Sequence, residues 1–388
     1  MHAATRIVDI REMAAPVASA MRNAYVDFSQ MTCSVLAVTA KHHGRRVTGF
    51  GYTSNGRYAQ SGLLRERFIP RLLAAGTDVF ADESSEGLDP RKVRGVLMQN
   101  EKPGGHGERS VAVGGLEMAF WDLAARIAGQ PGHRYIAARY GYPVPGDRVG
   151  VYAAGGYYSP SGNLADLRAE IRRFVDLGYP LVKMKIGGVR LAADIERVGA
   201  AVDEAQPDAV VAVDANGRLD VETAIAYGRA LGEVGVRWFE EPVDPLDYQG
   251  LADVAAVVAV PLATGENLFS VQDARNLLRF GGLDPSTAIL QMDPVLSYGL
   301  AEYREMLDAG RDAGWSAARF IPHGGHHLAL AAAAAFGLGG CEVYPTKFQP
   351  FGVASPAIRI EGGTMALPDV PGLGLELRPD LAAIIRGL

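Results

Sequence analysis

The sequence predicts an α/β protein in which a closed barrel of parallel strands and helices follows a smaller α+β domain. From about residue 148 onward, short apolar runs alternate with segments of helical spacing, a pattern typical of a parallel sheet. At least seven such units follow one another, which fits a closed (β/α) barrel better than an open sheet. The part before residue 140 has a different, mixed pattern and predicts a separate α+β domain.

The N-terminal part mixes strand-like and helical stretches. "TRIVDIREM" and "CSVLAVTA" alternate like strands, whereas "LLRERFIPRLLAAG" and "GGLEMAFWDLAARIAG" have helical spacing. The second helical stretch is followed by a glycine and Pro131, which are helix-ending signals. "RYGYPVPGDRVG" then indicates a linker. We therefore expect an N-terminal domain over residues 1–140.

The barrel is expected over residues 148–355. Its strands are predicted at the apolar runs "RVGVYAAGG", "LVKMKIGG", "VVAVDANG", "VRWFEEPV", "PLATGEN", "AILQMDP" and "ARFIPHGG". Helical stretches such as "LAADIERVGAAVDEA" and "VETAIAYGRALGEV" separate them.

Composition limits the classes of function. The chain has 388 residues, a net charge of −6 and a pI near 5.8, which gives no support to a nucleic-acid binder. Its two cysteines form no disulfide framework, which suits a reducing cytoplasm. The first residues lack the apolar core of a signal peptide, and "LALAAAAAFGLGG" is too short for a membrane span. We expect a cytoplasmic protein that has no nucleic-acid or membrane partner.

Charged residues end almost every predicted barrel strand. In "PLVKMKIGG", Lys183 and Lys185 point to the same face, because side chains alternate along a strand. Taken alone, this stretch fits an edge strand with a solvated lysine face equally well. In a parallel barrel, however, all strand ends meet at one mouth, where barrel enzymes keep their sites. The residues expected to meet there are Lys183, Lys185, Asp214, Glu240, Glu266, Asp293 and His323.

Three of these carboxylates are equally spaced. Asp214 to Glu240 is 240 − 214 = 26 residues, and Glu240 to Glu266 is 266 − 240 = 26 residues. Equal steps are expected if each acid occupies an equivalent place in successive βα units. Three carboxylates without a cysteine favour Mg²⁺ over zinc. The alternative for any single acid is a cap on the helix that follows its strand.

"IPHGGHH" contains the histidine expected to be catalytic. The histidines are not at the i, i+4 spacing of a helical zinc site, and the glycines indicate a loop. We interpret His323 as catalytic, and His326 and His327 as ordinary polar residues near it. Asp293 ends the neighbouring strand, so its carboxylate could fix the tautomer of His323 and raise its pKa.

The ordered motifs resemble those of the enolase superfamily, in its mandelate racemase and muconate-lactonizing branch. The "KMK" strand, "VDANG", "FEEP", "TGEN", "QMDP", "PHGG" and the ending "RIEGGTMALPDVPGLGLEL" match that branch in order, over essentially the whole chain. The resemblance implies a modified (β/α)7β barrel and an N-terminal capping domain that the C-terminal segment 356–388 rejoins.

The same resemblance implies a role for each site residue. Asp214, Glu240 and Glu266 correspond to Mg²⁺ ligands. Lys185 corresponds to one acid/base, and Lys183 to its carboxylate-binding neighbour. His323, paired with Asp293, corresponds to the other acid/base. Glu342 occupies the place of a further carboxylate that hydrogen-bonds the substrate.

The implied chemistry is removal of a proton alpha to a carboxylate. A divalent cation and Lys183 stabilise the resulting enediolate, a scheme long attributed to this superfamily. Lys185 must be neutral to act as a base, and we expect Lys183 and the cation to lower its pKa.

The capping segments are the informative ones for substrate. "RNAYVDFSQMT", "GYTSNGRYAQ", "NEKPGGHGERSVAVGG" and "VYAAGGYY" resemble those of the D-tartrate dehydratases within the branch. They offer donors for a second carboxylate and for hydroxyl groups, although each could equally be a surface loop residue: Arg22, Asn23, Asn55, Arg57, Lys102 and Tyr157. The resemblance therefore implies a Mg²⁺-dependent lyase that converts D-tartrate to oxaloacetate and water.

Other interpretations remain open at this point. A dehydratase of another aldarate or aldonate, or an α-hydroxy-acid racemase, would use the same catalytic parts. A non-catalytic barrel that binds sugar acids is the alternative from a different class. The expected partners are a small hydroxy-diacid and further copies of this chain.

Overall fold

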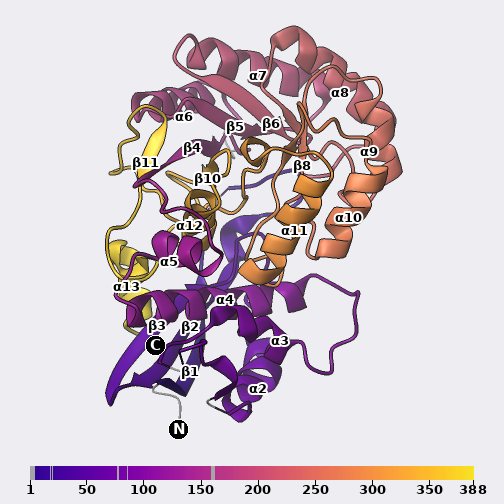
Figure 1. Ribbon diagram of the computed structural model, residues 1–388. Helices are drawn as coiled ribbons and strands as arrows, with labels where there is room; N and C mark the ends of the chain where they lie inside the picture. Colours follow the sequence, from indigo (N-terminus) through magenta and orange to yellow (C-terminus); the bar gives the residue numbers. More distant parts are fainter. Residues whose placement is uncertain (1–4, 18, 20, 77, 85, 159–161) are drawn as a thin grey trace.

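The computed structural model describes residues 5–388 except 18, 20, 77, 85 and 159–161. Figure 1 shows two parts, with the N-terminal residues gathered below a barrel whose helices α7 to α10 form an outer arc. No helix in the described part of the chain has both the length and the apolar character needed to cross a bilayer.

The N-terminal part is an antiparallel sheet covered by helices. Its strands are β1 (Thr5–Pro16), β2 (Thr32–His42) and β3 (Arg45–Tyr52), in that order. A short helical run, comprising α1 (Ser61–Leu63), the π-helix Leu64–Phe68 and α2 (Ile69–Ala74), and then α3 (Val93–Leu97) lead to α4 (Glu108–Ile127) and α5 (Gly132–Arg139).

Helix α4 packs directly on strand β3. A Cβ atom on Gly49 would lie 2.3 Å from the backbone nitrogen of Leu123, and one on Gly51 would lie 2.6 Å from the carbonyl oxygen of Gly115. Only glycine permits this close approach. The apolar faces meeting here include Val35, and they bury α4 almost completely over residues 110–125.

The second part is the barrel. Its strands run parallel in the order β10, β4, β5, β6, β7, β8, β9. They are β4 (Arg148–Gly155), β5 (Leu181–Lys185), β6 (Val210–Asp214), β7 (Phe239–Glu240), β8 (Leu262–Thr264), β9 (Ile289–Leu290) and β10 (Cys341–Val343). The helices between them are α6 (Leu164–Asp176), α7 (Leu191–Ala205), α8 (Val221–Val234), α9 (Tyr248–Ala255), α10 (Val271–Phe280), α11 (Leu300–Asp312) and α12 (His327–Ala335).

A short segment closes the barrel between β9 and β10. Phe320 forms a parallel bridge with Leu290, and the Ile321 amide donates to the Leu290 carbonyl at 3.0 Å. The Glu342 amide in turn donates to the Pro322 carbonyl at 3.2 Å. With this segment counted as a strand position, seven βα units and a final strand form the ring, which confirms the predicted (β/α)7β fold class with its capping domain.

The C-terminal segment passes from the barrel back to the N-terminal part. Strand β11 (Thr364–Ala366) pairs antiparallel with β4. Further along, the Leu373 amide donates to Asp122 of α4 at 2.6 Å, and Arg11 of β1 donates to the carbonyl of Leu388 at 2.8 Å. Helix α13 (Pro379–Ile385) and the C-terminal end lie beside the N-terminal part of the chain (Figure 1). The boundaries 1–140, 148–355 and 356–388 remain our proposal for the division into domains.

Candidate active site

A cavity of about 210 Å³ lies at the mouth of the barrel. Both parts of the chain line it, so its shape depends on how the capping loops sit on the strand ends. Its lining from the capping side includes Asn23, Tyr25, Phe28, Asn55 and Arg57, and its lining from the barrel includes Tyr157, Lys185, Asn216, Glu266, Asn267, His323, Tyr344 and Phe348.

Three carboxylates meet below this cavity. The register of the parallel strands pairs Lys185 with Asp214 and Asp214 with Glu240, so equivalent strand ends lie side by side. Glu266 follows β8 by two residues. One carboxylate oxygen from each of Asp214, Glu240 and Glu266 lies within 4.8 Å of the other two, which would let one cation reach all three.

The two lysines stand among these acids. Lys183 Nζ lies 2.5 Å from Glu240 Oε1, 2.7 Å from Glu342 Oε1 and 3.5 Å from Asp214 Oδ2, and its side chain is fully buried. Lys185 Nζ donates to Asp214 Oδ2, and it lies 5.4 Å from the centroid of the Tyr157 ring. The solvated-edge alternative for "PLVKMKIGG" is therefore wrong, because the same-face lysines pair with buried carboxylates.

The donor set fits a hard divalent cation. Burial and the neighbouring Asp214 carboxylate raise the pKa of Glu240 to about 8, which reflects crowded negative charge that a cation would relieve. Glu266 Oε2 is buried and accepts no hydrogen bond within the described residues. Oxygen atoms are the donors that Mg²⁺ prefers, and a buried carboxylate oxygen without a hydrogen bond is costly unless a positive charge lies near it.

The pKa of Lys185 differs from the sequence-based expectation. Burial alone would lower it, but the adjacent Asp214 carboxylate raises it above its ordinary value. The expectation considered only the repulsion from Lys183 and a cation, and it left out this direct ion pair. A cation bound by Asp214 would compete with Lys185 for the same negative charge, which lowers the pKa again.

Asp293 is fixed by five donors, and this fixes the imidazole of His323. Ser54, from the capping part, donates to Oδ2 at 2.7 Å, and His323 Nδ1 lies 3.0 Å from the same oxygen. His326 Nδ1 accepts from the Ala329 amide, so its Nε2 carries the proton and donates to Asp293 Oδ1 at 2.9 Å. The remaining donors to Oδ1 are the amides of Val295 and Leu296.

These contacts hold Asp293 ionised. Burial would raise its pKa, but the His326 and His323 rings hold it well below its usual value. For His323 burial has the opposite effect and would lower the pKa, but the carboxylates of Glu266, Glu342 and Asp293 raise it to about 9. His323 therefore presents its Nε2 atom to the cavity, 3.4 Å from Glu266 Oε2.

The other residues singled out in the sequence divide into two groups. Asn23, Asn55, Arg57 and Tyr157 line the cavity. Glu342 does not; it lies behind the lining, where the Tyr344 hydroxyl donates to it at 3.0 Å and the Gly324 amide at 3.1 Å.

Arg22 and Lys102 are both exposed and do not line the cavity. Arg22 is paired instead with Asp27 at 2.6 Å. Lys102 lies on the loop between α3 and α4, and the nearest link from that region to the barrel is the hydrogen bond between His106 and Tyr298 at 2.9 Å. A contact of Lys102 with substrate would require this loop to fold over the cavity.

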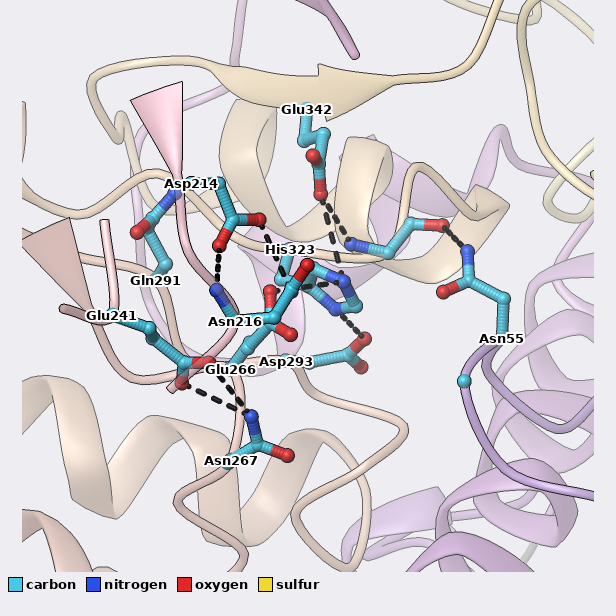
Figure 2. A network of polar contacts seen from close by, with 12 residues as sticks. Asn55, Asp214, Asn216, Glu241, Glu266, Asn267, Gln291, Asp293, His323 and Glu342 are labelled. Carbon is cyan, nitrogen blue, oxygen red and sulfur yellow. Dashed lines mark hydrogen bonds and ion pairs between the residues drawn. The ribbon is translucent and has the colours of Figure 1, made fainter. Parts of the chain in front are cut away.

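The sequence analysis did not identify several residues of the site. Figure 2 shows Asn216 donating to Asp214, and Asn267 donating to both oxygens of Glu241 at 3.0 Å. The signal was present in "VDANG" and "TGEN", where an asparagine follows Asp214 by two residues and Glu266 by one. Ser54 carried no such signal, because its partner Asp293 lies 239 residues away in the chain. His326 was interpreted as an ordinary polar residue near His323, whereas it donates to Asp293.

The comparisons agree with this geometry. The family model described as "Enolase C-terminal domain-like" matches residues 166–381. Arabinonate dehydratase of Saccharolobus solfataricus is 31% identical over 282 residues, covering 70% of this chain and 72% of its own. L-talarate/galactarate dehydratase of Salmonella typhimurium is 28% identical over 297 residues, covering 75% and 70%.

Solved structures share the fold over nearly the whole chain. A racemase from Streptomyces coelicolor with bound magnesium has a TM-score of 0.75 at 24% identity, covering 97% of this chain and 99% of that one. L-talarate dehydratase from Polaromonas sp. JS666, complexed with Mg and L-glucarate, has a TM-score of 0.75 at 25% identity, covering 95% and 94%. The chain therefore belongs to the enolase superfamily, in the branch of mandelate racemase and muconate-lactonizing enzyme.

Proposed function

We propose that this protein is a Mg²⁺-dependent acid-sugar dehydratase whose substrate is D-tartrate, which it converts to oxaloacetate and water. The observation that carries the proposal is that one small cavity is lined by Lys185, Glu266 and His323 together. Relatives that dehydrate arabinonate or talarate and galactarate support the reaction class.

Asp214, Glu240 and Glu266 would hold the metal. When bound, Mg²⁺ supplies positive charge that favours the substrate carboxylate as negative charge develops on it. Lys183 adds a second, fully buried positive charge beneath the same place.

The chain's own acid and base then move two protons. Lys185, as the neutral amine, removes the proton from C2. His323, as the imidazolium, donates its Nε2 proton to the C3 hydroxyl, so that the C3–O bond breaks and water leaves. The enol that remains takes up one proton at C3 and loses the proton of its C2 hydroxyl, which gives the ketone of oxaloacetate. Each tartrate thus loses the elements of one water molecule, and no oxidant or reductant is needed.

The size and charge of the cavity support a short diacid. About 210 Å³ is below the ~300–1,000 Å³ usual for drug-sized ligands, so the cavity suits a small acid. With one carboxylate at the cation, the other would lie toward Arg57. The guanidinium of Arg57 is already held by Asn267 at 2.7 Å and lies over the Phe269 ring, and such preorganised forks suit a carboxylate.

Arg57→Ala is expected to lower kcat/KM for D-tartrate by roughly 10–200-fold, the size of losing about 1.5–3 kcal/mol of charge-assisted hydrogen bonding. The measurement is steady-state oxaloacetate formation. Lys102→Ala serves as the parallel variant, since Lys102 was also predicted to contact the substrate. A similar loss there would show that the loop between α3 and α4 folds over the bound acid. Full activity of Arg57→Ala would remove Arg57 from the site.

Asp293→Asn is expected to lower kcat for dehydration by about 10²–10⁴-fold while C2 proton exchange with solvent persists. An amide at this position can donate to His323 Nδ1, which favours the neutral ring with its single proton on Nε2, so no imidazolium remains to protonate the departing hydroxyl. The ratio of deuterium exchange to oxaloacetate formation measures this. Ser54→Ala, which removes only one of the five donors to Asp293, is the matched control and should change the ratio little. An unchanged ratio in Asp293→Asn would contradict the role of the pair.

An α-hydroxy-acid racemase is the second candidate, because two acid/base groups line the same cavity. The experiment that separates the candidates is a screen of hydroxy acids with Mg²⁺: D-, L- and meso-tartrate, galactarate, glucarate and mandelate. We expect a 2-keto product from D-tartrate first. Preference for a six-carbon or monoacid sugar would overturn the substrate assignment and leave the chemistry in place.

A further inference from the structure

One arginine outside the cavity holds the backbone that carries Lys185. Arg197 lies on α7, and its guanidinium reaches two strand ends at once. Nη1 donates to the carbonyl of Lys185 at 2.9 Å, and Nη2 donates to the carbonyl of Gly156, just past β4, also at 2.9 Å. The Lys185 amide donates to the same Gly156 carbonyl at 3.3 Å.

The carboxylate of Asp194 orients this arginine and the loop after β5. Asp194 is fully buried, and its Oδ1 lies 2.8 Å from Arg197 Nη1. Its Oδ2 accepts from the Gly187 amide at 2.7 Å and from the Tyr227 hydroxyl at 3.0 Å. An ion pair with a buried carboxylate and this many partners favours a single arrangement, because moving any member leaves the buried Asp194 carboxylate with fewer donors.

Aromatic packing extends the Arg197–Asp194 pair toward the cavity, and we call these two residues and Tyr158 the Arg197 unit. The Arg197 guanidinium lies 4.2 Å from the centroid of the Tyr158 ring, and the Tyr158 hydroxyl donates to Asp194 at 2.9 Å. The preceding residue in the chain is Tyr157, whose ring faces the ammonium of Lys185. The Arg197 unit therefore contacts both the end of strand β5, which carries Lys185, and the residue next to Tyr157, whose ring Lys185 packs against.

Strands β4 and β5 pack closely where they end, and this restricts the backbone around the carbonyls that Arg197 joins. Gly156 has φ +57°, and a Cβ atom there would lie 2.3 Å from Cβ of Met184. The guanidinium of Arg197 joins the carbonyls of Gly156 and Lys185 by donating to each from a different nitrogen. Arginine supplies such a fork, and lysine has a single nitrogen.

We propose that Arg197, oriented by Asp194, is a positioning residue that holds the proton-abstracting Lys185 in register with the substrate. This inference rests on the proposed function, because it assigns Arg197 to the base of that reaction. Arg197 does not line the catalytic cavity. It lines a separate cavity of about 680 Å³ on the outer side of this unit, so small solutes can reach its place.

The test compares variants of the full-length protein with Mg²⁺ and D-tartrate. Arg197→Met should lower kcat for both C2 deuterium exchange and dehydration by about 100-fold, the effect of a misplaced catalytic group, with KM little changed. Arg197→Lys keeps a positive charge beside Asp194 and should lose about tenfold. Guanidinium chloride at about 10–50 mM, far below unfolding concentrations, should restore part of the rate to Arg197→Met and none to Lys185→Ala.

The matched control is Arg168→Met. Arg168 also donates to a backbone carbonyl of α7, that of Ala200 at 3.1 Å, but it lies away from β5. Its loss should leave kcat unchanged and guanidinium without effect. If the wild type turns over D-tartrate and Arg197→Met does so equally fast, the positioning role is wrong. Wild type that neither exchanges the C2 proton nor dehydrates any acid in the screen would instead overturn the proposed function. If Arg197→Met does not fold, full activity of Arg197→Lys decides against the inference.

Discussion

Lys185→Ala is expected to lose both dehydration and C2 proton exchange by about 10²–10⁴-fold, because no other described side chain with a free amine lines the cavity. Lys183 cannot replace it, since its ammonium is fully buried behind the lining and paired with Glu240 and Glu342. The measurement is the loss of the C2 proton signal of D-tartrate in deuterated buffer, followed beside oxaloacetate formation.

The control for this variant is Lys41→Ala, on an exposed position of β2, which should behave as wild type. His323→Asn is the informative companion: dehydration should be lost while exchange persists, because Lys185 remains. Normal exchange by Lys185→Ala would show that another group takes the proton.

Glu266→Gln is expected to abolish turnover and to weaken Mg²⁺ binding by more than about tenfold, with the fold retained. Glu266 contributes the one buried carboxylate oxygen of the triad that accepts no hydrogen bond within the described residues, so an amide there removes charge and breaks no hydrogen bond, although it also removes the charge that faces His323 Nε2 at 3.4 Å. Titration calorimetry with Mg²⁺ alone measures the binding, and circular dichroism checks the fold.

Glu233→Gln, on the exposed face of α8, is the matched control for the loss of one negative charge. It should bind Mg²⁺ and turn over as the wild type does. Tight Mg²⁺ binding by Glu266→Gln would remove Glu266 from the ligand set.

The barrel and its mouth were predictable because they repeat. Each βα unit carries the same pattern, so Asp214, Glu240 and Glu266 are recognisable by their equal steps, and a parallel register necessarily brings them together. The placement of Lys183 and Lys185 on the same face of their strand was also predictable, because side chains alternate along a strand.

The capping side was less predictable, because loop positions depend on long-range contacts that no local pattern encodes. Asn55 and Arg57 reach the cavity through partners more than 200 residues away, Gly324 and Asn267, whereas Lys102 is exposed. The direction of the pKa of Lys185 was missed for a related reason: the ion pair with Asp214 depends on the cross-strand register, not on neighbouring residues.

We propose that one cavity joins a metal triad, a lysine base and a histidine acid to dehydrate a short hydroxy-diacid. The most direct measurement is incubation of the purified protein with D-tartrate, with Mg²⁺ and separately with excess EDTA, followed by detection of oxaloacetate. We predict oxaloacetate formation that requires Mg²⁺ and is absent in Lys185→Ala and His323→Asn. Oxaloacetate formed at full rate in EDTA, or no 2-keto acid from D-tartrate or from any other hydroxy acid in the screen, would contradict the account.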